Sequence, residues 1–178
     1  MPAATPNPGA NSSGTAAATG SPAARSIAAP TRPTWRVALA QTAPILGDVA
    51  RNLAVHEQQI QAARAAGAHL IVFPELSLTG YYLRDIVPDV ALTTSAPEIG
   101  RLIDAAGDMS VAFGFVERDD RQRFYNSAGW IEAGRLTHVH RKVYLPTYGL
   151  FDEQRYFAAG HRVRAGVSPR LGRFGMII

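Results

Sequence analysis

The sequence predicts an α/β protein whose core is a mixed β-sheet flanked by helices. Three observations support this prediction: continuous apolar runs of strand length, a helical stretch between the first two runs, and a hairpin pattern further along the chain. A strand–helix–strand order usually produces parallel pairing, whereas the two strands of a hairpin pair antiparallel. We therefore expect both kinds of pairing.

The first expected elements are a strand, a helix and a second strand. The apolar runs at residues 35–41 and 69–73 are interpreted as buried strands, the second being too continuous for a half-exposed one. The helix between them should begin at Asp48, its N-cap, and extend to Ala66, with Gly67 as the stop. Its expected core-facing residues, a helical spacing apart, are Leu53 and Ile60.

The middle of the chain predicts a helix, a strand and a hairpin. The helix is expected at about residues 97–106 and the strand at residues 111–116. Residues 124–131 and 136–142 are apolar-rich and flank the turn-forming segment 132–135, which is typical of a β-hairpin. A last strand is expected at residues 172–178.

Composition divides the chain into two parts. Residues 1–33 are almost entirely Ala, Pro, Gly, Ser, Thr and Asn, and this segment is predicted to be a disordered tail. Residues 34–178 are enough for one domain with a real core. No signal-peptide pattern occurs, and the apolar runs are far shorter than a membrane span, so we expect a cytoplasmic protein without a membrane partner.

Charge and short motifs argue against several classes of partner. The formal charge is +4, but the arginines are scattered apart from one loose group, and we interpret them as a solvated basic face without a nucleic-acid partner. Glycine-rich phosphate loops are absent, and we expect no cofactor. The loose group consists of Arg162, Arg164, Arg170 and Arg173.

His138 and His140 have the spacing that places two rings on one face of a strand. No third ligand follows at a suitable spacing, and strand histidines are usually packing or surface residues. The chain has no cysteine, which excludes disulfides and thiolate metal sites. We therefore predict no metal site.

Two charged residues lie where strands are expected to end. Glu75 follows a buried strand directly after Pro74, and Lys142 ends the hairpin, with Pro146 marking the exit. Reactive groups of α/β folds lie on such loops, and a carboxylate near apolar neighbours gains the proton affinity that a general base needs. The alternative is an ion pair that only joins two loops, and spacing alone favours this alternative, because such pairs are common.

Seven blocks of this sequence, in order, resemble the nitrilase, or carbon-nitrogen hydrolase, superfamily. The resemblance covers residues 35–178, and any single block would be weak evidence. The blocks are residues 37–41; 47–48 with 52–53; 67–75; 78–81; 125–128; 141–142 with 145–146; and 151–157 with Gly160. Residues 145–153 most resemble the glutaminase domain of glutamine-dependent NAD synthetases, although single-domain amidases have similar sequences.

The resemblance implies the N-terminal part of a four-layer αββα sandwich with mixed sheets and a Glu-Lys-Cys site that hydrolyses non-peptide C–N bonds. Glu75 matches the general base, and Lys142 the cation that stabilises the tetrahedral oxyanion. Glu153 matches a glutamate that holds the lysine and substrate, the alternative being a surface carboxylate. Tyr148 is expected to line the substrate pocket, with buried packing as the alternative. A small amide is the implied partner, and a homo-oligomer is possible.

The family's nucleophilic cysteine follows a strand that resembles residues 171–178, and this chain contains no cysteine. Two explanations remain: a domain incomplete at its C-terminus, or a non-catalytic relative that binds an amide or a partner. We favour the first, because a buried strand needs neighbours on both sides. The 178-residue chain is predicted to be inactive, since Ser77 and Ser127 are weakly placed to replace a thiolate.

We predict that the codon after Ile178 encodes cysteine. Sequencing the locus past this position tests the prediction, and any other residue there contradicts it.

Overall fold

The computed structural model describes residues 34–178, so the predicted tail at residues 1–33 lies outside the described part of the chain. Five strands form one mixed sheet in the order β1-β2-β3-β4-β5. β1, β2 and β3 pair parallel, and β3, β4 and β5 pair antiparallel, which confirms the predicted mixture. The strands are β1 (Val37–Leu39), β2 (Leu70–Val72), β3 (Ser110–Arg118), β4 (Phe124–Glu132) and β5 (Arg135–Arg141).

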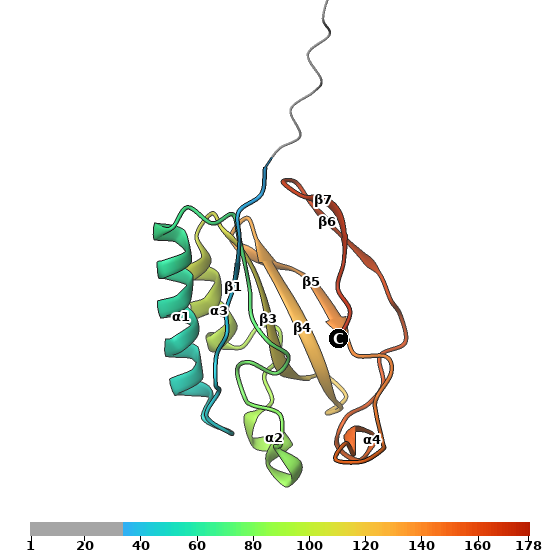
Figure 1. Cartoon of the computed structure of the whole chain (residues 1–178). Helices are drawn as coiled ribbons and strands as arrows, with labels where there is room; N and C mark the ends of the chain where they lie inside the picture. The colour runs from blue at the N-terminus through green and yellow to red at the C-terminus, as the bar shows by residue number, and fades with distance from the viewer. Residues whose placement is uncertain (1–33) are drawn as a thin grey trace, which may run out of the picture. The chain divides into compact units, whose positions relative to one another are not determined.

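Two helices, α1 (Val49–Ala65) and α3 (Pro97–Ala106), cover one face of this sheet (Figure 1). The Asp48 side chain accepts a hydrogen bond from the backbone N–H of Arg51 at 3.0 Å, and Gly67 has a φ of 70° beyond the last turn. The helix α1 therefore begins and ends where the sequence predicts. Leu53 and Ile60 are fully buried in the core between the helices and the sheet.

A second, two-stranded sheet lies on the other face. It consists of β6 (Ala165–Ser168) and β7 (Gly172–Gly175), paired antiparallel. The Phe174 ring packs against Trp130 of β4 at a centroid distance of 4.2 Å. The buried Glu132 carboxylate accepts hydrogen bonds from Ser110 at 3.2 Å and from Ser168 at 2.7 Å. Apolar packing and this buried carboxylate thus hold the hairpin against the main sheet.

Several short elements have no clear sequence signal. They are a 3-10 turn η1 (Arg84–Ile86) and the one-turn helices α2 (Val87–Val90) and α4 (Glu153–Tyr156). Segments this short cannot form alone and depend on tertiary contacts, so neither propensity nor periodicity identifies them. The sequence did not predict β6 either, because an isolated hairpin is only marginally stable in water and its strands depend on tertiary contacts.

Two sequence predictions are wrong in extent or burial. The buried strand expected at residues 35–41 is a three-residue edge strand in which Leu39 is 75% exposed. Within residues 34–178 β1 pairs only with β2, and Leu39 lies on the sheet face opposite the helices. The strand expected at residues 172–178 ends at Gly175, and Ile177 is 82% exposed, because β7 pairs only with β6 among the described residues.

The described residues thus form one helix-covered sheet with a hairpin on its opposite face. The complete four-layer sandwich stays a prediction.

No helix between residues 34 and 178 is both long enough and apolar enough to cross a bilayer.

A buried polar pair connects α1 to the loop after β2. Nε2 of His56 lies 2.9 Å from Oγ of Ser77, and Nδ1 lies 2.7 Å from the carbonyl oxygen of Asn52. The ring stacks on Phe73 at 4.0 Å. Burial lowers the pKa of His56 from 6.5 to about 4, although the hydrogen bond to Asn52 opposes this shift. The imidazole is therefore neutral at pH 7 and structural.

We predict that stability falls as the pH decreases from 6.5 to about 4. In this window the unfolded chain binds a proton on His56 that the folded chain does not, so the free energy of unfolding decreases by up to roughly 3 kcal/mol. Urea unfolding at several pH values measures this loss. A His56→Gln variant should show a smaller pH dependence than the parent, and the exposed control His161→Gln should keep that of the parent; equal slopes in all three proteins would contradict the prediction.

Candidate active site

Lys142 lies directly after β5 and is the only lysine of the chain. Its Nζ donates one hydrogen bond to Oε1 of Glu75 at 2.8 Å and another to Oε1 of Glu153 at 2.9 Å. The side chains of Lys142 and Glu153 are 10% and 3% exposed, and that of Glu75 is 34% exposed. Three of the four residues predicted to form the site therefore meet in one largely buried ion cluster.

The backbone at Glu75 is held close to the neighbouring strand. Leu76, the next residue, has a φ of 48°, a conformation that non-glycine residues rarely adopt. Gly114 of β3 lies under this turn, and a Cβ atom there would come within 2.3 Å of the Leu76 nitrogen. The Leu78 N–H donates to the Gly114 carbonyl at 3.1 Å. Only glycine at position 114 lets the loop pack this closely.

The other two charged residues are fixed by backbone hydrogen bonds. The N–H of Lys142 donates to the Asn126 carbonyl, and the Lys142 carbonyl accepts from Gly160, both at 2.8 Å. Glu153 is the first residue of α4, and its N–H donates to the Pro146 carbonyl at 3.1 Å. The loop between Lys142 and Glu153 therefore folds back and brings both side chains together.

The sequence reasoning assigned no role to two further residues of this cluster. Nδ2 of the fully buried Asn126 donates to Oε1 of Glu75 at 2.6 Å, and the Tyr81 hydroxyl donates to Oε1 of Glu153. A signal existed, because Asn126 lies within one of the family blocks and Tyr81 ends another. Residue type alone does not indicate which buried partner such a group contacts.

The two carboxylates keep Lys142 charged. Burial by itself lowers the pKa of Lys142, but hydrogen bonds to Glu75 and Glu153 outweigh burial and raise this pKa above its ordinary value of 10.5. The pKa of Tyr81 is also raised, by burial and then by its hydrogen bond to Glu153. At neutral pH the cluster therefore contains an ammonium and a neutral phenol, and both are hydrogen-bond donors.

Two cavities reach the cluster from different sides. Glu153 and Tyr81 line a cavity of about 360 Å³ that also contains charged residues of both signs. Glu75 lines a more apolar cavity of about 530 Å³ together with Trp130 and Ile178. The cluster is thus accessible to a small polar ligand on at least one side.

Tyr148 lies apart from the ion cluster. Its side chain is 71% exposed, and its ring meets the Phe151 ring at 5.6 Å. Buried packing, the alternative considered for this residue, is therefore wrong. It does not line either of the two cavities, and its contact with substrate stays a prediction.

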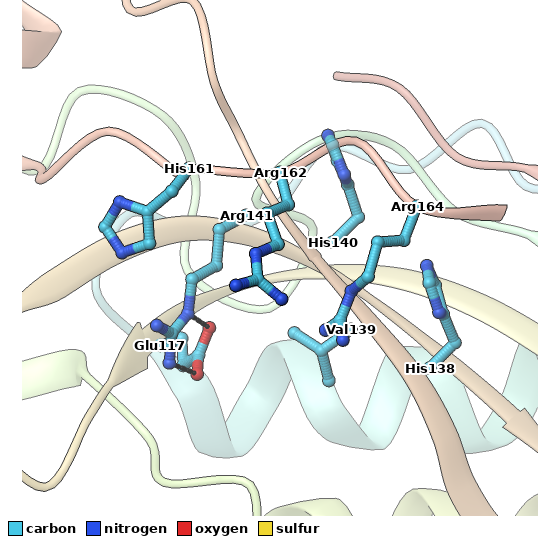
Figure 2. A pocket seen from close by; sticks show the side chains of 8 residues that line it. All are labelled: Glu117, His138, Val139, His140, Arg141, His161, Arg162 and Arg164. Carbon is cyan, nitrogen blue, oxygen red and sulfur yellow. Dashed lines mark hydrogen bonds and ion pairs between the residues drawn. The ribbon is translucent and has the colours of Figure 1, made fainter. Parts of the chain in front are cut away.

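His138 and His140 do lie on one face of β5 (Figure 2). Within residues 34–178 no group of three or more histidine, aspartate or glutamate side chains is arranged to hold a metal ion.

The two serines considered as substitutes for a thiol form hydrogen bonds with other buried side chains. Ser77 pairs with His56, and the Ser127 hydroxyl donates to Glu117 at 2.7 Å.

The model of the carbon-nitrogen hydrolase family matches residues 36–178. The chain belongs to the carbon-nitrogen hydrolase family. The family resemblance inferred from the seven sequence blocks is thereby confirmed, and the matched region includes all residues of the ion cluster.

Curated relatives of this chain include glutamine-dependent NAD(+) synthetases. The protein from Acinetobacter baylyi is 34% identical over 145 residues, covering 81% of this chain and 26% of the relative. That from Thermotoga maritima is 35% identical over 131 residues, covering 72% and 22%. The chain therefore spans about a quarter of the length of the curated relatives it matches.

Solved structures show the same fold. The glutamine-dependent NAD+ synthetase from Acinetobacter baumannii, in complex with ADP, superposes with a TM-score of 0.69 at 34% identity, covering 80% of this chain and 27% of that one. A mutant amidase from Nesterenkonia sp. AN1, with acrylamide added at its active-site cysteine, gives a TM-score of 0.69 at 22% identity, covering 81% and 57%. At that identity the amidase supports the fold alone.

We predict that Lys142 titrates above pH 10.5 in the folded chain. Because it is the only lysine, selective lysine isotope labelling gives a single side-chain resonance set for an NMR titration. Replacing both partners in a Glu75→Gln/Glu153→Gln variant should lower the midpoint, since burial remains while the carboxylates are lost. The control Glu98→Gln, on α3, should leave it unchanged. An unaltered midpoint in the double variant would show that the carboxylates do not stabilise the ammonium.

Proposed function

We propose that this carbon-nitrogen hydrolase acts on a carboxamide, with Glu75 as general base and Lys142 as the oxyanion-stabilising cation. The observation that supports this proposal is the ammonium of Lys142 between two carboxylates, one beside each cavity. In this proposal Glu153 holds the lysine and the substrate, and Tyr148 contacts the substrate from the exposed loop.

The proposed chemistry is acyl transfer from nitrogen to the thiol of the cysteine expected after Ile178, and then to water. Glu75 accepts the thiol proton as sulfur attacks the amide carbon, and it gives the proton to the leaving ammonia. Water then releases the acyl group as a carboxylic acid. Lysine has three N–H donors, and Lys142 uses two on carboxylates. The third is available for the oxyanion, whose negative charge develops only during attack.

Two buried acceptors support an amide ligand. Oδ1 of Asn126 and Oε2 of Glu153 are buried and accept no hydrogen bond within the described residues. An unsatisfied buried acceptor costs roughly 1–3 kcal/mol, so such atoms commonly belong to a ligand site. The NH₂ group of a carboxamide carries two N–H donors and would satisfy acceptors of this kind.

Glutamine is the carboxamide that we favour. The cavity beside Glu153 is lined by both positively and negatively charged residues. A free amino acid has an ammonium and a carboxylate group, and each needs a partner of opposite charge. Two curated relatives are named as glutamine-dependent synthetases, which agrees with this choice. The charged lining residues other than Glu153 are Arg84, Asp85, Asp152 and Arg155.

A second candidate is a non-catalytic amide-binding or partner-binding relative. It is favoured by one observation: the 178 residues contain no cysteine, and the serines near the site are committed to other buried groups. The cytoplasmic location and homo-oligomeric assembly expected from the sequence also stay predictions.

Ammonia release by the natural gene product tests the proposal. We expect turnover of glutamine, reduced at least about a hundredfold in a Glu75→Gln variant, which lacks the general base. The matched control Glu98→Gln, a half-buried residue of α3, should keep full activity. The 178-residue chain should bind glutamine without releasing ammonia.

Two results would contradict this assignment. Turnover that persists in the Glu75→Gln variant would show that Glu75 is not the general base. Ammonia release by the cysteine-free chain would show that the reaction does not need a thiol. Binding of amides without turnover of any amide, nitrile or carbamoyl compound by the natural gene product would favour the non-catalytic alternative.

A further inference from the structure

A groove outside the amide site gathers basic and titratable side chains. It has a volume of about 330 Å³ and lies between β5 and the segment 161–164, which passes over that strand in Figure 2. None of the residues of the ion cluster lines it. The basic lining consists of His138, His140, Arg141, His161, Arg162 and Arg164.

The charge of this groove is not balanced by its own acidic group. Glu117 is the one acidic lining residue, and Arg141 binds both of its oxygens, at 2.9 Å through Nε and at 2.5 Å through Nη2. Arg162 and Arg164 form no ion pair within the described residues, and both are exposed. Two guanidinium groups at the groove are therefore free to bind an anion.

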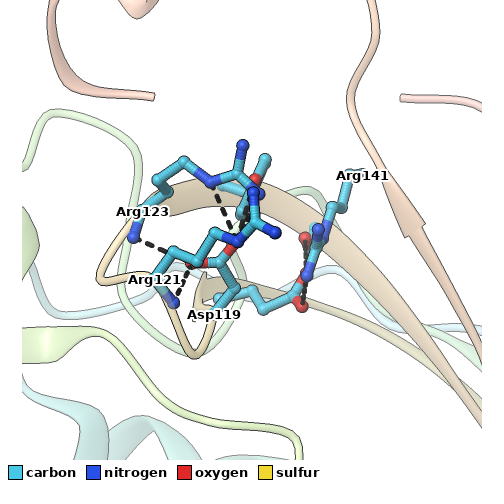
Figure 3. A network of polar contacts seen from close by, with 7 residues as sticks. Asp119, Arg121, Arg123 and Arg141 are labelled. Carbon is cyan, nitrogen blue, oxygen red and sulfur yellow. Dashed lines mark hydrogen bonds and ion pairs between the residues drawn. The ribbon is translucent and has the colours of Figure 1, made fainter. Parts of the chain in front are cut away.

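The neighbouring carboxylate is also occupied, as Figure 3 shows. Asp119 accepts hydrogen bonds from the backbone of Arg121 and from both the backbone and the guanidinium of Arg123. Tyr125 donates to the same carboxylate at 3.1 Å. The hydrogen bonds of Asp119 are thus made within the turn and strand that follow it, and its carboxylate does not neutralise the groove.

Two histidines of the groove have unused hydrogen-bonding groups. His140 is only 3% exposed and makes no side-chain hydrogen bond within residues 34–178, and Nε2 of His138 is buried without a partner. Burial lowers the pKa of both rings, and for His138 the nearby Arg164 adds to this effect. Each ring is therefore neutral at pH 7 and offers one N–H donor. Polar groups buried in this way are usually completed by a ligand or by water.

We propose that this groove is a binding site for a phosphate group, either free phosphate or the phosphate of a small monoester. Arg162 and Arg164 bind its oxygens through their guanidinium groups, and His140 donates from the buried side of the groove. Guanidinium is suited to phosphate because its planar N–H groups pair with two oxygens at once. A metal cation does not fit, since the arginines repel it, and a single carboxylate has too few oxygens for all three donors.

Histidine NMR with inorganic phosphate as the probe tests the proposal on the 178-residue chain. The chain contains five histidines, which give five ring signals. At constant pH and ionic strength, phosphate should shift the signals of His138, His140 and His161 in a saturable manner. His56, a buried residue of α1 that pairs with Ser77, and His69, which accepts a hydrogen bond from the backbone N–H of Arg36, lie outside the groove; their signals serve as internal controls and should not move.

A matched pair of double variants separates a site from diffuse charge. Arg162→Gln/Arg164→Gln should weaken phosphate binding at least about tenfold, because both charged donors are lost. Arg121→Gln/Arg135→Gln removes the same charge from exposed side chains outside the groove and should bind phosphate as the parent does. All four side chains are exposed, so the variants should unfold at the temperature of the parent.

Three outcomes would overturn the proposal. The first is the absence of saturable shifts with both inorganic phosphate and methyl phosphate. The second is an equal loss of affinity in the two double variants, which indicates only general charge attraction. The third is acetate binding as tightly as phosphate at equal ionic strength, which would assign the groove to carboxylates.

Discussion

The structure around the site depends on one constraint: the ammonium of Lys142 must be neutralised in a place where water hardly reaches it. A buried charge without a partner destabilises a protein by roughly 3–5 kcal/mol, so the fold must bring carboxylates to it. Glu75 and Glu153 come from opposite sides of the site, one from the loop after β2 and one from the start of α4. This pairing fixes three chain segments relative to one another.

The surrounding packing makes that pairing geometrically possible. β3 and β4 form the long antiparallel centre of the sheet, and they contribute Gly114 under the Glu75 loop and Asn126 beside the Glu75 carboxylate. The His56–Ser77 pair ties the same loop to α1. Contacts on both sides of this loop hold Leu76 in its strained backbone conformation.

Sequence reasoning predicted the long, regular elements and failed on the short ones. α1, α3 and the β4–β5 hairpin occur where periodicity and turn residues indicated them, because each has strong local signals. β6, α2 and α4 are four-residue elements whose stability comes from distant contacts, such as Ser168 on Glu132. β1 has the composition of a buried strand but is an edge strand, because composition does not reveal how many neighbours a strand has.

The sequence by itself determined the family and the order of the main elements, and it singled out the three charged residues of the candidate site. It could do so because Glu75, Lys142 and Glu153 stand in local motifs that can be recognised without knowing their partners. Only the tertiary structure decided that these three side chains touch, and that Asn126 and Tyr81 complete their hydrogen bonds. The same holds for the arginines and histidines of the groove, which looked like a scattered basic surface in the sequence. The reason is physical: hydrogen bonding and charge neutralisation act over a few ångströms in space, between residues up to 72 positions apart in the chain.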